Sequence, residues 1–305
     1  MQIHLSPALL TSFIPLGIFC LCVFLPAGIV LWVRGRQTRG KKHPLNFDLL
    51  RSPGQSLKER IEELTEKITD YLLFMFIGPL ALYAIVVSQY LTSTPPSPFL
   101  LILYLGVALG LSVFFSLKIF RLMHTRTHYR LGYDCELMVG QGLHTLLAEG
   151  FRVFHDFPAD GFNIDHIAIG PTGVFAIETK GRAKSSKAEN RNWEVRYDGR
   201  QLAFPGWTET RPITQAVDQA RWLRTWLCQA TGSETPVEPV LAVPGWYIKR
   251  TGPGGLRVYN GKNPGFLARG AQVLSAEQIR AIAFQVERQC RTVATTAYQT
   301  DSAKK

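Results

Sequence analysis

Residues 163–180 read NIDHIAIGPTGVFAIETK, and this stretch decides the fold. Two short runs rich in β-branched and aromatic residues flank the turn sequence GPTG, a pattern typical of a β-hairpin. A register in which Gly170 pairs with Gly173 places Asp165 opposite Glu178. The hairpin is therefore predicted to bring two acidic side chains together, at the end of the strands that lies away from the turn.

This acid pair is the first candidate for chemistry. In the predicted register the Cβ atoms of Asp165 and Glu178 lie about 5 Å apart on one face of the sheet, and Lys180 follows two residues later on that face. Two carboxylates so close repel each other by on the order of 3 kcal/mol at an effective dielectric constant of about 20. Protonation, a basic side chain or a divalent cation relieves the repulsion, and hard oxygen donors suit Mg²⁺ or Mn²⁺. Ordinary surface ion pairs with Lys180 and Arg182 explain the same pattern equally well.

Short motifs along the chain carry a family resemblance. The sequences NIDH at 163–166, GVF at 173–175 and IETK at 177–180 closely resemble the core of the nuclease-related domain, NERD. Upstream, GYDCE at 132–136 resembles the family's G-x-x-G-E, and downstream RPITQ at 211–215 resembles its N-P-x-x-Q. The family is similar to the restriction-endonuclease-like PD-(D/E)xK enzymes.

The resemblance implies a set of catalytic residues. Asp165, Glu178 and Glu136 would be ligands of Mg²⁺ or Mn²⁺. Lys180 would orient the attacking water or stabilise the developing charge, and Gln215 would be an accessory polar contact. The implied reaction is metal-assisted hydrolysis of a phosphodiester bond in DNA or RNA.

The sequence departs from the family pattern at two positions, and one histidine lies next to the predicted acid pair. Cys135 stands where the family has glycine, and Arg211 stands where asparagine precedes the proline, but neither change removes a proposed ligand. Strand alternation places His166 on the face away from Asp165. His166 is therefore expected to be a packed or hydrogen-bonded core histidine.

A basic segment follows the predicted site. It is expected to contact phosphates as a loop and an edge strand, with a simply solvated face as the alternative. The proposed nucleic-acid-binding residues are Arg182, Lys184, Lys187 and Arg191.

Three apolar segments precede this domain. Transmembrane helices are predicted at about 9–33, 71–91 and 99–120, each containing at least 19 consecutive uncharged residues. At about 1.5 Å per residue, each segment crosses a hydrocarbon core of about 30 Å. Because these uncharged runs hold no ionisable Asp, Glu, Lys or Arg, nothing marks an ion path, and they are expected to be an anchor.

The distribution of charge predicts the topology. Residues 34–70 carry nine Lys or Arg side chains, whereas the loop at 92–98 carries none. The positive-inside bias puts the N-terminus outside and the C-terminal domain in the cytoplasm, as in a multi-pass protein of a bacterial inner membrane. The formal charge is +11, but residues 130–305 hold 22 basic and 17 acidic side chains, a balance that permits nucleic-acid binding without requiring it.

A cytoplasmic helix at about 56–70 is predicted to lead into the second apolar segment. Ser56 and Glu59 form a capping-box pattern, and an apolar stripe follows at helical spacing. The stripe is expected to pack on the soluble domain, on the membrane surface or on a second copy of the chain in a homodimer. Its members are Leu57, Ile61, Leu64 and Ile68.

These observations predict a helical membrane anchor, residues 1–129, joined to an α/β domain, residues 130–291, whose mixed sheet is flanked by helices. Residues 292–305 are expected to be a disordered tail. Helices are predicted at 136–147, 214–229 and 276–291, the hairpin within 163–180 with apolar runs at 167–169 and 174–177, and further strands at 151–154, 192–197, 237–243 and 256–259.

Two functions are compatible with the sequence. One is a membrane-anchored, metal-dependent nuclease that acts on DNA or RNA at the cytoplasmic face. The other is a catalytically silent, membrane-tethered module that binds nucleic acid or protein. The acid pair favours the first, because a purely structural domain has no physical need to keep two carboxylates in repulsive contact.

Overall fold

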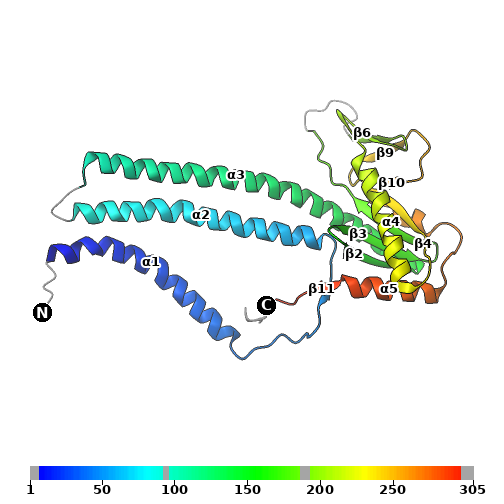
Figure 1. Cartoon of the computed structure of the whole chain (residues 1–305), viewed down its shortest axis with the longest axis horizontal. Helices are drawn as coiled ribbons and strands as arrows, with labels where there is room; N and C mark the ends of the chain where they lie inside the picture. The colour runs from blue at the N-terminus through cyan, green and yellow to red at the C-terminus, as the bar shows by residue number, and fades with distance from the viewer. Residues whose placement is uncertain (1–6, 92–95, 186–192, 297–305) are drawn as a thin grey trace. The chain divides into compact units, whose positions relative to one another are not determined.

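The structure is a computed structural model that describes residues 7–91, 96–185 and 193–296 (Figure 1). Its contacts divide the chain into two units. The helical unit contains the residues up to Pro44 together with Glu62–Arg126, and the α/β unit contains Leu45–Ile61 and Thr127–Thr295. Residues 45–61, which the sequence analysis assigned to the anchor, therefore group with the α/β unit.

Three long helices make up the N-terminal part of the described chain: α1 Pro7–Thr38, α2 Gln55–Tyr90 and α3 Pro98–Leu143. By length and composition each is apolar enough to cross a membrane. The predicted helix at 56–70 continues directly into the second apolar segment, as expected. The separation of 99–120 from 136–147 is wrong, because both segments belong to α3. No proline interrupts the helix between them.

The α/β unit is built on a five-stranded mixed sheet with the order β10-β8-β4-β3-β2. The β2–β3 and β3–β4 pairs are antiparallel, whereas the β4–β8 and β8–β10 pairs are parallel. The predicted mixed sheet is thus confirmed. The strands are β2 Arg152–Pro158, β3 Asn163–Gly170, β4 Gly173–Thr179, β8 Val237–Ala242 and β10 Arg257–Tyr259.

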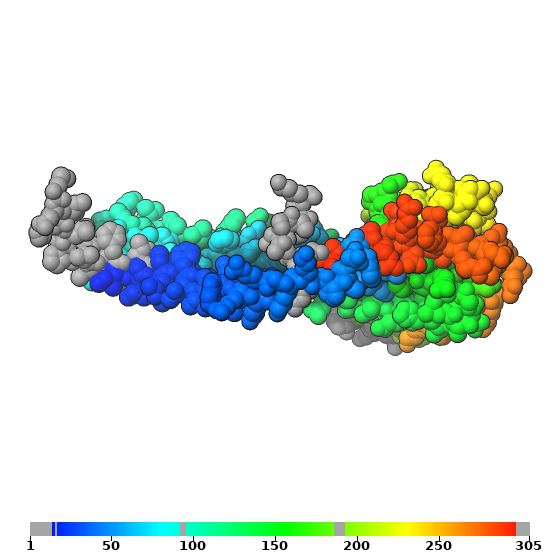
Figure 2. Space-filling model, turned by 90° about the horizontal axis from the view of Figure 1, so that it is seen from below, coloured from blue at the N-terminus to red at the C-terminus, as the bar shows by residue number. Residues whose placement is uncertain are grey.

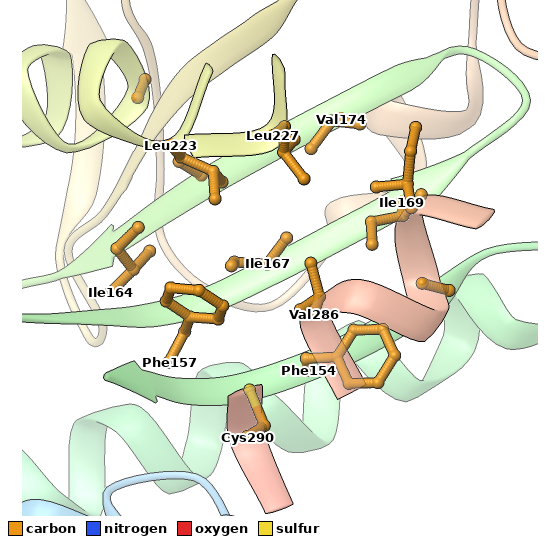
Figure 3. Close-up of a cluster of buried hydrophobic side chains, with 14 of the residues drawn as sticks. Phe154, Phe157, Ile164, Ile167, Ile169, Val174, Leu223, Leu227, Val286 and Cys290 are labelled. Atoms are coloured by element: carbon orange, nitrogen blue, oxygen red, sulfur yellow. The ribbon is translucent and has the colours of Figure 1, made fainter. Parts of the chain in front are cut away.

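Helices cover both faces of this sheet. Helices α4 Arg211–Thr231 and α5 Ala276–Cys290 pack on one face, where Leu223 and Val286 meet Ile167 of β3 (Figure 3). The C-terminal part of α3 packs on the other face together with the short 3₁₀ helices η1 His144–Glu149 and η2 Pro264–Ala268. Each fully buried aliphatic side chain contributes about 1.5–3 kcal/mol, so the two cores hold the central strands firmly.

A second sheet of four strands has the order β7-β6-β5-β9. The predicted strand at 192–197 appears as β5, but the expectation that it lies at an edge is wrong. Strand β9, which is distant in sequence, pairs with its second side. The strands are β5 Glu194–Tyr197, β6 Leu202–Phe204, β7 Trp207–Glu209 and β9 Tyr247–Arg250.

The segment before α2 joins the end of α5. Strand β1 Leu49–Leu50 pairs antiparallel with β11 Arg291–Val293, and Figure 2 shows this blue segment against the red end of the α/β unit. The prediction of disorder from Thr292 is therefore wrong for Thr292 and Val293. The cause is a pairing across the whole chain, which no local pattern reveals.

The N-terminus of α2 is capped differently from the prediction. The helix begins at Gln55, so Ser56 lies inside it and does not form a capping box. The carboxylate of Asp156 on β2 instead accepts hydrogen bonds from the Ser56 backbone N–H at 2.9 Å and from its hydroxyl at 2.8 Å. Of the predicted apolar stripe, Leu57 lies close to Gly132 of α3 and Leu64 is buried.

Candidate active site

The hairpin has the predicted register. Gly170 pairs with Gly173, and the last pair of the β3–β4 ladder is His166 with Ile177. Beyond this point β4 continues to pair with β8 while β3 separates from it. The Asp165 carboxylate fills the gap and accepts a hydrogen bond from the Thr179 backbone N–H at 2.6 Å. Asp165 is thus held at the point where the two strands diverge.

Glu178 lies on β4 beside this point and is 1% exposed. Its Oε1 atom forms an ion pair with the partly exposed Lys180 ammonium. Its Oε2 atom is buried and has no hydrogen-bond partner among the described residues. A buried polar atom left unsatisfied costs on the order of 1–3 kcal/mol, and more when it carries charge. The arrangement therefore favours a ligand at Oε2.

Electrostatics show that four predicted site residues lie close together. The pKa of Glu136 on α3 is raised to about 8, first by burial and then by Asp156 and Glu178, against the lowering effect of Lys180. The pKa of Asp165 is raised well above its usual range by burial, then by Glu178 and Glu136, and is lowered by Lys180 and the Thr179 N–H. The structure thus brings Glu136, Asp165, Glu178 and Lys180 into one interacting group.

The donor set bears on which ion the group can hold. Among residues 7–91, 96–185 and 193–296, no group of three or more His, Cys, Asp or Glu side chains is arranged to hold a metal ion. The free Glu178 oxygen beside Asp165 fits an ion that keeps several of its waters, which is the usual behaviour of Mg²⁺ in proteins.

One further buried acid, Asp156, was not predicted from the sequence. Asp156 on β2 is 2% exposed and has a left-handed backbone with φ of 50°. Its Oδ2 atom accepts from Arg51 Nε at 2.7 Å as well as from Ser56, and its Oδ1 atom accepts from Asn163 Nδ2 at 3.1 Å. Because Arg51 is more than 100 residues away in sequence, no spacing pattern could have identified this cluster.

Comparison with known families is decisive for the central part of the α/β unit. Residues 131–244 match the model of the nuclease-related domain. This segment is a NERD domain. No curated protein and no solved structure matches the chain. The matched segment contains all of the predicted catalytic residues, whereas Arg51, β10 and α5 lie outside it.

Helix α4 of the NERD domain carries two glutamines one turn apart. Gln215, the predicted accessory residue, is half-buried and lines a surface hollow with Trp222. It makes no hydrogen bond to a carboxylate in the described part of the chain. Gln219 is the buried one, and its Nε2 donates to the Asn163 carbonyl at 3.2 Å, two residues before Asp165. Residues at i and i+4 lie on one face of a helix. The spacing of the two glutamines was therefore the sequence signal that could have identified Gln219.

The predicted nucleic-acid-binding residues have different surroundings. Arg182 donates from Nε and Nη2 to Glu209 of β7 at 2.8 and 2.6 Å, so this ion pair must open before Arg182 can contact a phosphate. Lys184 is exposed, and its ammonium lies 5.4 Å from the ring centre of Trp246. Lys187 and Arg191 lie outside the described residues.

His166 of the NERD domain is a core histidine, as expected. It is fully buried, and its Nδ1 lies 2.9 Å from Nδ1 of His155. Burial lowers the pKa of both rings. However, Ile164 and Ile167 pack in the same core although they are three residues apart (Figure 3). Strict alternation is therefore interrupted beside Asp165, and the argument that placed His166 on the opposite face does not hold.

Proposed function

We propose that this protein is a membrane-anchored, metal-dependent nuclease that hydrolyses phosphodiester bonds of DNA or RNA at the cytoplasmic face of a membrane. The nuclease-related domain supports the reaction class. The observation that carries the proposal is the buried Glu178 carboxylate, whose second oxygen lacks a partner in the described chain while it interacts with Asp165 and Glu136.

Asp165 and Glu178 would hold Mg²⁺ or Mn²⁺, with Glu136 as a further carboxylate. When bound, the ion polarises a phosphoryl oxygen and lowers the pKa of a coordinated water. Lys180, released from Glu178 by the competing positive charge, would hydrogen-bond the attacking water or the developing charge on the phosphate. In the metal-free protein Glu136, with a pKa raised to about 8, holds its proton near neutral pH and would release it where a bound cation favours the carboxylate.

The anchor part of the proposal depends on three helices that are long and apolar enough to cross a membrane. The excess of basic residues between the first two apolar segments supports an outer N-terminus and a cytoplasmic α/β unit. The nucleic acid would then be met at the inner surface of the membrane.

A binding module without catalysis is the second candidate. Two observations favour it: the described residues contain no three-ligand group, and Lys180 already neutralises one Glu178 oxygen. In that case the domain would hold nucleic acid or a protein without cleaving it.

Cleavage by the full-length protein in detergent separates the two candidates. Plasmid and single-stranded substrates are incubated with and without Mg²⁺ or Mn²⁺. We expect metal-dependent cleavage that is lost in Asp165→Asn and Lys180→Ala. Glu238→Gln, which removes an exposed carboxylate paired with Arg257, is the matched control and should remain active. Binding without cleavage under every metal condition would leave only the module.

A further inference from the structure

The outer face of the four-stranded sheet is exposed and basic. In β5, Val195 and Tyr197 point into the core, whereas Arg196 between them is exposed. Arg196 lies directly across from Lys249 of β9, which is also exposed. Like charges opposite each other on neighbouring strands destabilise a sheet. The repulsion between these two side chains therefore does not stabilise the sheet.

Two large aromatic side chains lie beside these charges. Tyr247, across from Glu194, is 55% exposed, and Trp193 is 46% exposed. Their rings meet edge to face with 5.3 Å between centres. The hydrophobic core of this sheet is on its other face, where Tyr197, Leu202 and other buried side chains meet Trp246. Trp193 and Tyr247 thus leave aromatic surface in water that the core does not require.

The charge on this face is only partly neutralised. Glu194 accepts a hydrogen bond from Arg196 Nε at 3.1 Å. Lys249 makes no ion pair with any residue in the described ranges. A net positive face with exposed aromatic rings complements a chain of phosphates with accessible bases, since the rings offer stacking surfaces and the basic side chains contact the backbone.

The sheet is also tied to the candidate active site. Two residues after Lys180, Arg182 binds Glu209 of β7, and its carbonyl accepts a hydrogen bond from Trp246 Nε1 at 3.1 Å. Trp246 directly precedes Tyr247. A residue spans at most about 3.6 Å of chain. Arg182, which attaches to this sheet, is therefore at most about 7 Å along the chain from Lys180.

We propose that Trp193, Arg196, Tyr247 and Lys249 form a platform that binds single-stranded nucleic acid. A single strand is required because a duplex buries the faces of its bases, which the aromatic rings would stack on. The platform would deliver an unpaired strand to the site next to Lys180. This inference rests on the proposed function for its substrate class, but the binding step requires neither metal nor turnover.

The test is fluorescence anisotropy with a labelled 20-nucleotide oligothymidine and a duplex of equal length. Full-length protein in detergent carries Asp165→Asn, and EDTA removes divalent ions, so cleavage plays no part. We expect single strands to bind more tightly than duplex. Tyr247→Ala should weaken single-strand binding at least fivefold, whereas Tyr247→Phe, which keeps the ring, should retain it.

Charge is tested with a pair of double variants. Arg196→Gln with Lys249→Gln should reduce the slope of log Kd against log salt concentration by about 1.4. Arg221→Gln with Arg224→Gln removes two exposed charges from α4 and should leave the slope nearly unchanged. Unchanged tryptophan-detected melting of each variant shows that the fold is intact.

Equal binding of duplex and single strand, or full binding by Tyr247→Ala, would overturn the platform even if the enzyme cleaves DNA. Conversely, loss of cleavage with intact oligonucleotide binding would refute only the nuclease. A lipid surface is the competing occupant. Protection of residues 194–197 and 247–250 from hydrogen exchange in anionic nanodiscs without nucleic acid, compared with neutral ones, would assign the face to the membrane instead.

Discussion

Asp156 of β2 and Glu178 of β4 are two buried carboxylates of the same sheet that differ in their hydrogen-bond partners. Asp156 has donors on both oxygens, including the guanidinium of Arg51 and the hydroxyl of Ser56. Glu178 has Lys180 on one oxygen and no described partner on the other. Glu136 interacts with both acids, so the two centres are electrostatically linked.

The difference indicates what each acid is for. A buried charge that is fully hydrogen-bonded supports structure, whereas one with an unsatisfied oxygen beside other acids is held at a cost. Functional sites are where proteins keep such costs. We therefore interpret Asp156 as a clamp that ties the segment before α2 to the sheet, and Glu178 as part of the candidate active site.

The largest effect is expected at the clamp. Arg51→Ala leaves the Asp156 charge buried without its main partner and should lower the free energy of unfolding by about 3–5 kcal/mol. Denaturant unfolding of the full-length protein in detergent, followed by tryptophan fluorescence, measures the loss. Arg221→Ala, which breaks an exposed pair with Asp218, should cost less than about 1 kcal/mol. Equal losses for the two variants would show that Asp156 is no clamp.

The next effect is expected at Glu178 in the candidate active site. Mn²⁺ at about 100 times its Kd should stabilise the protein by about 2.7 kcal/mol, because it satisfies the Glu178 oxygen and relieves the repulsion with Asp165. Thermal melting of the full-length protein with and without the ion measures this gain. Glu178→Gln should lose the gain and Glu238→Gln should keep it. A gain that persists in Glu178→Gln would place the ion elsewhere.

Glu136, which interacts with both Asp156 and Glu178, should make the folding stability depend on pH. The pKa of Glu136 is about 8 in the folded state and ordinarily 4.5. Its contribution to the free energy of unfolding is therefore fully present below about pH 4.5 and is lost as the pH rises through 8. The slope reaches at most about 1.4 kcal/mol per pH unit. Glu136→Gln should flatten the stability profile of metal-free protein between pH 6 and 8. Parallel profiles for the two proteins would contradict the raised pKa.

The smallest expected effect comes from the same Asp→Asn substitution at Asp165 and at Asp156, which should change stability in opposite directions. In metal-free protein at pH 9, Asp165→Asn removes repulsion with Glu178 while its side-chain oxygen still accepts the Thr179 N–H, so stability should rise by about 1 kcal/mol, or about 2–4 °C in Tm. The same change at Asp156 should lower Tm, since it weakens the bond to Arg51. A change of Tm in the same direction for both variants would contradict the distinction between Asp156 and the candidate active site.

The hairpin and its acids were predictable because the information is local. The GPTG turn and the period of two predict the register that the structure has from Gly170–Gly173 to His166–Ile177, although the ladder ends there and Asp165 and Glu178 themselves are not paired. The apolar helices and the NERD motif are equally local. Gln219, the Asp156 clamp and the place of β5 inside its sheet were not predicted, since each depends on partners that are distant in sequence.

The sequence by itself determined the class of domain, the register of its central hairpin and three helices apolar enough for a membrane. These features follow from side-chain periodicity and turn chemistry within a few residues. Only the tertiary structure decided which buried acid is neutralised and which is left with an unsatisfied oxygen. That choice depends on which donors from remote segments reach each carboxylate, and burial makes the presence or absence of one donor worth several kcal/mol.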